Sequence, residues 1–90
     1  MKKLPATVRA YSRSPTFDET SIPDALRKNH QTKAGVWGVI NVLSGELRYR
    51  VVETETETTL SPELPGIIEP KSLHAVEPLG PVSFYVEFWR

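Results

Sequence analysis

The two histidines, His30 and His74, are the side chains best suited to chemistry in this chain. A neutral imidazole ring binds ions such as Zn, Fe or Ni, and two or three protein ligands suffice when water completes the coordination shell. His30 opens a segment that runs into an apolar strand, and His74 closes a segment with two turns, 65–74. If the sheet folds back on itself, both rings reach one cavity. The alternative is that each ring only hydrogen-bonds a backbone group at a strand end.

Glu87 is the candidate third ligand. It stands within the apolar and aromatic segment 83–89, and a carboxylate is costly to bury there unless it pairs with a cation or a metal ion. The sequence therefore favours a divalent metal site of His30, His74 and Glu87. The alternative places Glu87 on the solvent face of an edge strand, together with Ser83 and Tyr85.

A substrate pocket beside these ligands would use Lys33, Trp37 and Tyr85. Lys33 is close to His30 in the chain and could hold an anionic ligand, while the two aromatic rings could line the pocket. Aromatic side chains of barrels are more often part of the core. No P-loop, G-x-S-x-G, dinucleotide glycine pattern or H-E-x-x-H is present, so kinase, hydrolase and dehydrogenase functions lack support.

Composition limits the class of protein. Ninety residues are one domain, 1–90, and a core this small favours a homodimer that uses the β-rich, aromatic terminal segments. Equal numbers of acidic and basic side chains, 11 each, argue against binding nucleic acid or an anionic membrane. There is no cysteine, no apolar run of the roughly 20 residues that a membrane helix needs, and no signal peptide after the basic first residues. We expect a cytoplasmic protein.

The elements that must position these residues are mostly strands. Eight prolines and five glycines divide the chain into short segments rich in Val, Ile, Thr, Tyr and Phe. One helical turn is expected at 22–28, and Phe17 is expected to plug one end of a barrel. Strand 36–43 has two apolar faces, which predicts a central strand covered on both sides. The remaining strands are expected at 6–12, 47–51, 67–69, 74–78 and 82–89, with an exposed, glutamate-rich strand pair at 53–59.

Three separated motifs resemble one family. Segments 30–47, 69–78 and 84–88 are similar, in this order, to the cupin-like domain found at the front of tellurite-resistance protein B and in small stand-alone relatives. The resemblance spans about residues 15 to 90. It implies an all-β, cupin-like double-stranded β-helix, a small jelly-roll barrel. In the fused proteins a following domain carries out methyl transfer, so the resemblance does not assign that activity to these residues.

In this resemblance, some metal ligands of ordinary cupins have no counterpart in the sequence. Ordinary cupins usually offer two histidines one residue apart and then a glutamate, whereas Thr32 stands at the second histidine position and 33–38 contains no carboxylate. The function predicted at this point is a small protein that binds a metal ion, a small molecule or an oxyanion in a tellurite or toxic-oxyanion stress response. Two alternatives stay open: a metal-dependent dioxygenase or isomerase that uses His30 and His74, and a metal-free interaction module.

Overall fold

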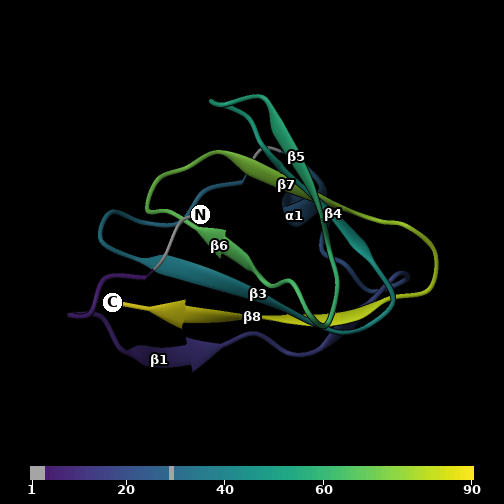
Figure 1. Cartoon of the computed structure of the whole chain (residues 1–90), viewed down its shortest axis with the longest axis horizontal. Coiled ribbons are helices and arrows are strands. Elements are labelled where there is room, and N and C mark those ends of the chain that lie inside the picture. Colours follow the sequence, from purple (N-terminus) through teal and green to yellow (C-terminus); the bar gives the residue numbers. More distant parts are fainter. Residues whose placement is uncertain (1–3, 29) are drawn as a thin grey trace.

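Within the part of the chain that the structure describes, alternation of β-branched or aromatic residues with polar ones produces eight short strands and one helical turn (Figure 1). The structure is a computed structural model that describes residues 4–28 and 30–90. The strands are β1 (Ala10–Arg13), β2 (Phe17–Asp18), β3 (Trp37–Ser44), β4 (Leu47–Val51), β5 (Thr56–Leu60), β6 (Gly66–Ile68), β7 (His74–Pro78) and β8 (Ser83–Trp89). Helix α1 (Asp24–Arg27) lies between β2 and β3 in the chain and packs against β7.

The larger sheet has five antiparallel strands in the order β1-β8-β3-β6, with β2 pairing the other end of β8. Its inner face is formed by Gly38, Ile40 and Val42 of β3 and by Phe84 and Val86 of β8, all of which are buried. On the outer face, the residues of β8 and Trp37, Val39 and Asn41 of β3 are only half-buried, and Leu43 is exposed. β3 is therefore a central strand, as predicted, but the expectation that both of its faces are covered is wrong.

The smaller sheet has three antiparallel strands in the order β5-β4-β7. In β4, Leu47 and Tyr49 are buried while Arg48 is exposed, which is the alternation that the sequence predicted. Arg48 extends across the outer face and forms ion pairs with Glu57 of β5 at 3.6 Å and Glu77 of β7 at 3.3 Å. Exposed pairs of this kind contribute little to stability.

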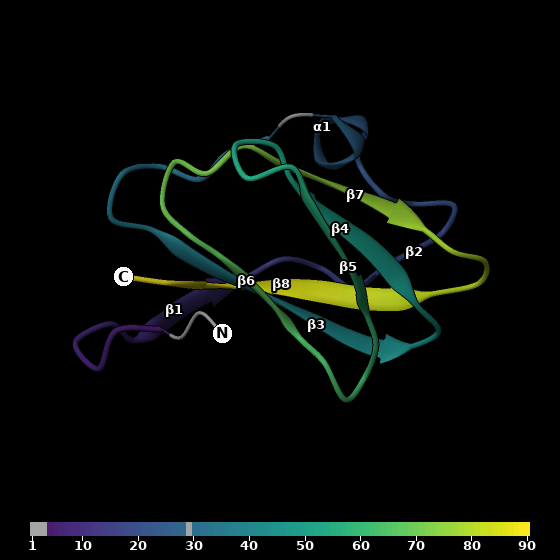
Figure 2. The ribbon, with the colours of Figure 1, turned by 45° about the horizontal axis from the view of Figure 1, so that its top comes forward.

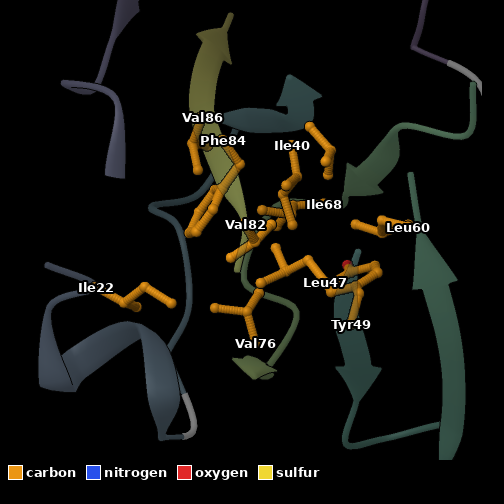
Figure 3. Packing of buried hydrophobic residues seen from close by; sticks show 11 residues of the cluster. Ile22, Ile40, Leu47, Tyr49, Leu60, Ile68, Val76, Val82, Phe84 and Val86 are labelled. Carbon is orange, nitrogen blue, oxygen red and sulfur yellow. The ribbon is translucent and has the colours of Figure 1, made fainter. Parts of the chain in front are cut away.

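The core lies between the inner faces of the two sheets (Figures 2 and 3). Phe84 and Leu47 are fully buried, and Figure 3 shows how the side chains of both sheets and of the segment before α1 converge. Phe17 of β2 is partly buried and packs on Phe84 with ring centroids 5.8 Å apart. The cluster comprises Ile22, Ile40, Val42, Leu47, Tyr49, Leu60, Ile68, Val76, Val82, Phe84 and Val86.

A tight hairpin between β3 and β4 depends on Gly45. Its φ is +77°, a conformation that residues with a Cβ rarely adopt, and a Cβ built there would lie 2.1 Å from the carbonyl oxygen of Pro81. The turn therefore needs glycine both for its backbone conformation and for the close approach of the β7–β8 connection.

The all-β class predicted from the sequence is confirmed, and so is a helical turn within 22–28, which forms at Asp24–Arg27. Among residues 4–28 and 30–90, no strand joins the two sheets by hydrogen bonds, so the fold is a pair of open sheets and not a closed barrel. The first strand begins at Ala10 and not at residue 6, because the chain before it forms a turn. No helix in the described ranges is long and apolar enough to cross a membrane.

Candidate functional site

The two histidine segments meet through their backbones. The amide of His30 donates to the carbonyl oxygen of His74, and the amide of His74 donates to the carbonyl oxygen of His30, both at 2.8 Å. A second link follows directly, because the side chain of Gln31 donates to the carbonyl oxygen of Lys71 at 2.9 Å. Lys71 has a positive φ of 60°, which forms the tight turn that precedes β7. These links hold segments 40 residues apart side by side.

As a result the imidazole rings of His30 and His74 lie with centroids 5.5 Å apart, nearly perpendicular to one another. His74 is buried, and its Nδ1 lies 2.9 Å from the carbonyl oxygen of Ser72. Because a carbonyl oxygen only accepts, the proton of neutral His74 is on Nδ1 and the lone pair is on Nε2. The Nδ1 atom of His30 is buried and has no hydrogen-bond partner among the described residues.

Both rings line a cavity of about 240 Å³ between α1, β7 and the large sheet. Its walls are mainly apolar and include Phe17, Leu26, Ile68, Val86 and Phe88. Thr32, at the position where ordinary cupins usually have a second histidine, also lines the cavity and donates its hydroxyl to the carbonyl oxygen of Val36 at 2.8 Å. The hydroxyl of Thr32 therefore serves as a hydrogen-bond partner of a nearby backbone carbonyl group.

Burial is the largest influence on the pKa of His74. Desolvation lowers the pKa of His74 below its ordinary value of 6.5, and neighbouring His30 lowers it further. The hydrogen bond to Ser72 and the charge of Glu53 act in the opposite direction but do not outweigh these effects. The ring is therefore more readily protonated in the unfolded chain than in the folded one.

This difference predicts a loss of stability in mild acid. Since the folded state binds the proton of His74 more weakly than the unfolded state does, the free energy of unfolding should fall as the pH drops below about 6.5. Urea unfolding between pH 7.5 and pH 5.0 measures this fall. His74→Gln, which cannot ionise, should show a flatter profile than the parent over this interval. An equally steep profile in the variant would assign the pH dependence to other groups.

The other predicted site residues lie elsewhere. Glu87, Tyr85 and Trp37 are on the outer face of the large sheet, opposite to Val86, which lines the cavity. Glu87 accepts a hydrogen bond from Nε1 of Trp89 at 2.9 Å. Tyr85 stacks beneath the guanidinium group of Arg13, which lies 4.8 Å from the ring centroid.

Lys33 is exposed in the loop before β3 and does not line the cavity. The structure thus brings His30 and His74 together at one cavity. Four other predicted site residues do not line this cavity: Glu87, Lys33, Trp37 and Tyr85.

Sequence reasoning missed Glu53. Its carboxylate accepts the amide hydrogen of Leu73 at 2.9 Å, next to His74, and this hydrogen bond is the main reason that the pKa of Glu53 is lowered. The residue belongs to the glutamate-rich segment 53–59, which was expected to be an exposed strand pair without a role in a site. This contact was not visible in the local pattern, because it joins residues 20 positions apart.

Comparisons with known proteins identify related chains. Residues 12–86 match the family described as the TehB-like domain. Two curated relatives, both named probable S-adenosyl-L-methionine-dependent methyltransferase TehB and both from strains of Haemophilus influenzae, are 33% and 32% identical over 76 residues. Each match covers 78% of this chain but 26% of the relative, so the chain spans about a quarter of the length of these relatives.

Two solved structures share the fold. The crystal structure of TehB from Haemophilus influenzae superposes with a TM-score of 0.82 and 27% identity, over 91% of this chain and 31% of that one. A crystal structure from Escherichia coli strain K12 superposes with a TM-score of 0.90 over 100% of this chain and 97% of that one. At 17% identity the second likeness shows the fold alone.

These matches correct the function predicted from the sequence. A protein that binds a metal ion or a small molecule is not what they indicate, because the family and its named relatives are associated with methyltransferases. In residues 4–28 and 30–90, no group of three or more His, Cys, Asp or Glu side chains is placed to hold a metal ion. The function prediction rested on the two histidines at strand entrances and on the resemblance to a cupin-like domain.

Proposed function

Since the chain belongs to the TehB-like domain family, we propose that it is an auxiliary, non-catalytic domain that supports an S-adenosyl-L-methionine-dependent methyltransferase. One observation carries the proposal: the chain matches about a quarter of a probable methyltransferase, and it has the fold of that quarter. Methyl transfer would then belong to the remaining three quarters. By the names of these relatives, we place this role in tellurite resistance.

The architecture supports a division of labour. Nucleotide-containing cofactors commonly bind at the carboxyl ends of parallel strands in open α/β sheets. All strand pairs that the structure describes are antiparallel, and α1 has only four residues. We infer that the domain acts by contact with a methyltransferase, and that its two sheets are a reduced form of the cupin-type double-stranded β-helix.

A domain exchange tests this role. In Haemophilus influenzae TehB, the segment that matches this chain is replaced by residues 1–90, and S-adenosylhomocysteine formation is measured with tellurite as the acceptor. We expect the chimera to keep activity within a few-fold of the parent and a deletion of the segment to lose most of it. The isolated 90-residue chain should form none.

Two results would contradict the proposal: methyl transfer by the isolated chain, or a deletion protein as active as the chimera. Phe84→Ala in the chimera tests whether the segment must be folded or serves only as a spacer. The change removes a fully buried ring and should disturb the fold. Leu43→Ala is the matched control, since Leu43 is 55% exposed.

We also propose a homodimer and a cytoplasmic location. Support for the dimer comes from β1, which is an edge of the large sheet, and from Tyr11, which is 45% exposed on that edge. An unpaired strand edge of this kind is able to pair with a second copy. Light scattering at high micromolar concentration should give twice the mass of the chain, and a monomeric mass would refute the dimer.

A further inference from the structure

The cavity that His30 and His74 line leads from the surface of the molecule into its interior. Pro23 and Ala25, at the start of α1, are exposed residues of the cavity wall. Figure 2 shows α1 at the surface beside β7. His74 lines the same cavity but is only 1% exposed. The cavity therefore has a mouth at α1 and a buried end at the imidazole ring of His74.

The ring of His74 has a nitrogen that is available to an occupant of this cavity. Nδ1 is engaged by the carbonyl oxygen of Ser72, and no described residue forms a hydrogen bond with Nε2. The described atom that is both sealed from solvent and without a partner is Nδ1 of His30, and not Nε2 of His74. Nε2 therefore retains contact with open space. A hydrogen bond from an occupant would satisfy this atom.

The cavity selects an uncharged hydrogen-bond donor. Because the proton of neutral His74 is on Nδ1, Nε2 carries a lone pair and accepts a hydrogen bond. Burial keeps this ring neutral at neutral pH, since it lowers the pKa of His74. None of the described residues that line the cavity is Asp, Glu, Lys or Arg. A charged occupant would lose its water here and gain no counter-ion, which is costly.

The volume fits one aromatic side chain. Pockets for drug-sized ligands measure about 300–1,000 Å³, which is more than the 240 Å³ of this cavity. A dry apolar cavity of about 150 Å³ is sufficient for a benzene ring, so the remaining space suits a substituent on such a ring. Phe17, Leu26 and Phe88 are half-buried apolar residues of the wall that a ring would contact.

Among aromatic side chains, tyrosine matches the polar end of the cavity best. Its hydroxyl donates to Nε2 of His74 and can also accept a hydrogen bond. The ring of His30 lies 5.5 Å from that of His74, so the hydroxyl would be close to a second imidazole. Phenylalanine would leave Nε2 without a partner, and tryptophan is larger and only donates.

We propose that this cavity receives a tyrosine side chain of the methyltransferase polypeptide, whose hydroxyl donates a hydrogen bond to Nε2 of His74. The identity of this partner rests on the proposed function. The backbone on either side of the tyrosine would cross the surface at Pro23 and Ala25. Aromatic side chains that fill a pocket on the partner are typical anchors of protein interfaces, and tyrosine combines an apolar ring with a polar end.

The exposed tyrosine of this chain, Tyr11, is a poorer occupant. Tyr11 is 45% exposed on β1, and the guanidinium group of Arg90 lies 4.0 Å from its ring centroid. Insertion of Tyr11 from a second copy would separate the ring from this group or would bring a positive charge to the apolar walls. A tyrosine of a different polypeptide meets neither cost.

Two capped pentapeptides test the proposal by amide chemical-shift changes in the folded 90-residue chain. Both consist of glycine and serine around a central residue, which is tyrosine in one and phenylalanine in the other. We expect the tyrosine peptide to shift the amides of His74 and of α1 with a dissociation constant of about 1 mM or tighter. The phenylalanine peptide should bind at least about fivefold more weakly, because it cannot donate to Nε2.

A third probe separates a polypeptide from a free phenol. 4-Methylphenol has the ring and the hydroxyl of tyrosine but no backbone. It should bind more weakly than the tyrosine peptide, because it makes no contact at the mouth, and it should leave the amides of Asp24 and Ala25 unshifted.

Variants locate the contact. His74→Asn keeps an amide nitrogen that can donate to the carbonyl oxygen of Ser72 but lacks Nε2, so it should abolish the preference for tyrosine over phenylalanine. Ala25→Phe, at an exposed position, narrows the mouth and should weaken the tyrosine peptide by at least about fivefold. Leu43→Phe is the matched control, since Leu43 is exposed and does not line the cavity, and it should leave binding unchanged.

The absence of shifts at the solubility limit of the tyrosine peptide would overturn the proposal. So would equal affinity for the tyrosine and phenylalanine peptides, or an unchanged preference in folded His74→Asn. Tighter binding of 4-methylphenol than of the peptide would overturn the polypeptide partner. Shifts at His74 that grow with the concentration of the chain itself and vanish in Tyr11→Ala would assign the cavity to a second copy, and would also overturn it.

The spectrum of each variant shows whether it is folded. Because the peptides contain no methyltransferase, their failure to bind leaves the domain-exchange result unaffected. If the tyrosine peptide bound but the domain exchange failed, the methyltransferase would be refuted as the partner, and the two failures are therefore distinguishable.

Discussion

Replacing Phe84 by alanine should lower the free energy of unfolding by about 3–5 kcal/mol. The ring is fully buried at the centre of the core and packs on Phe17, and the cavity left by its removal cannot be filled by neighbours held in two sheets. A domain of this size is stable by about 5–15 kcal/mol, so the change removes a large part of the total. Urea unfolding followed by tryptophan fluorescence measures it.

The matched control is Leu43→Ala, since Leu43 is 55% exposed at the end of β3. It should change the free energy of unfolding by less than about 0.5 kcal/mol, as surface substitutions usually do. If the two variants were destabilised equally, the core would not lie where the structure places it.

Gly45→Ala should also destabilise the fold strongly, by about 2–5 kcal/mol. Part of this cost is the φ of +77°, which costs a residue with a Cβ about 1–2 kcal/mol. The rest arises because the new Cβ would lie 2.1 Å from the carbonyl oxygen of Pro81, and backbone must move to relieve the overlap at a further cost of about 1–3 kcal/mol.

Gly35→Ala separates these two causes. Gly35 has the same φ of +77°, but a Cβ placed there meets nothing within 4 Å. It should therefore carry the backbone cost alone, about 1–2 kcal/mol. Equal destabilisation of the two variants in denaturant unfolding would show that the contact with Pro81 is relieved freely, which would contradict the tight packing of the β7–β8 connection against the hairpin.

Local pattern predicted those parts of the fold that depend on neighbours in the chain. Leu47, Tyr49 and Val51 alternate with charged residues, and this pattern predicted both the strand and its buried face. The turns in 65–74, before His74, were visible as glycine and proline signals. The meeting of the two histidine segments followed from the expectation that the sheet folds back.

Long-range features were not predicted, because periodicity does not reveal what covers a face. Trp37 and Val39 are apolar, but no layer of the described chain buries them fully, so β3 is covered on one side. Whether the sheets close into a barrel depends on pairing between the edge strands of the two sheets, and the sequences of these strands carry no signal for it. The role of Glu53 depends on a contact with Leu73, far along the chain.

The strand order of the large sheet has a consequence for synthesis on the ribosome. β8 is the last of the eight strands to emerge, yet it lies between β1 and β3, and the pairs that the structure describes for β1 and β2 are both with β8. These two strands must therefore wait, unpaired, until nearly the whole segment has been made. A nascent chain that has not yet released Ser83–Trp89 lacks Phe84 and the centre of its core, and it exposes strand edges and apolar surface throughout that interval. Slow translation of Ser83–Trp89 would thus lengthen the period in which this domain needs protection by a chaperone.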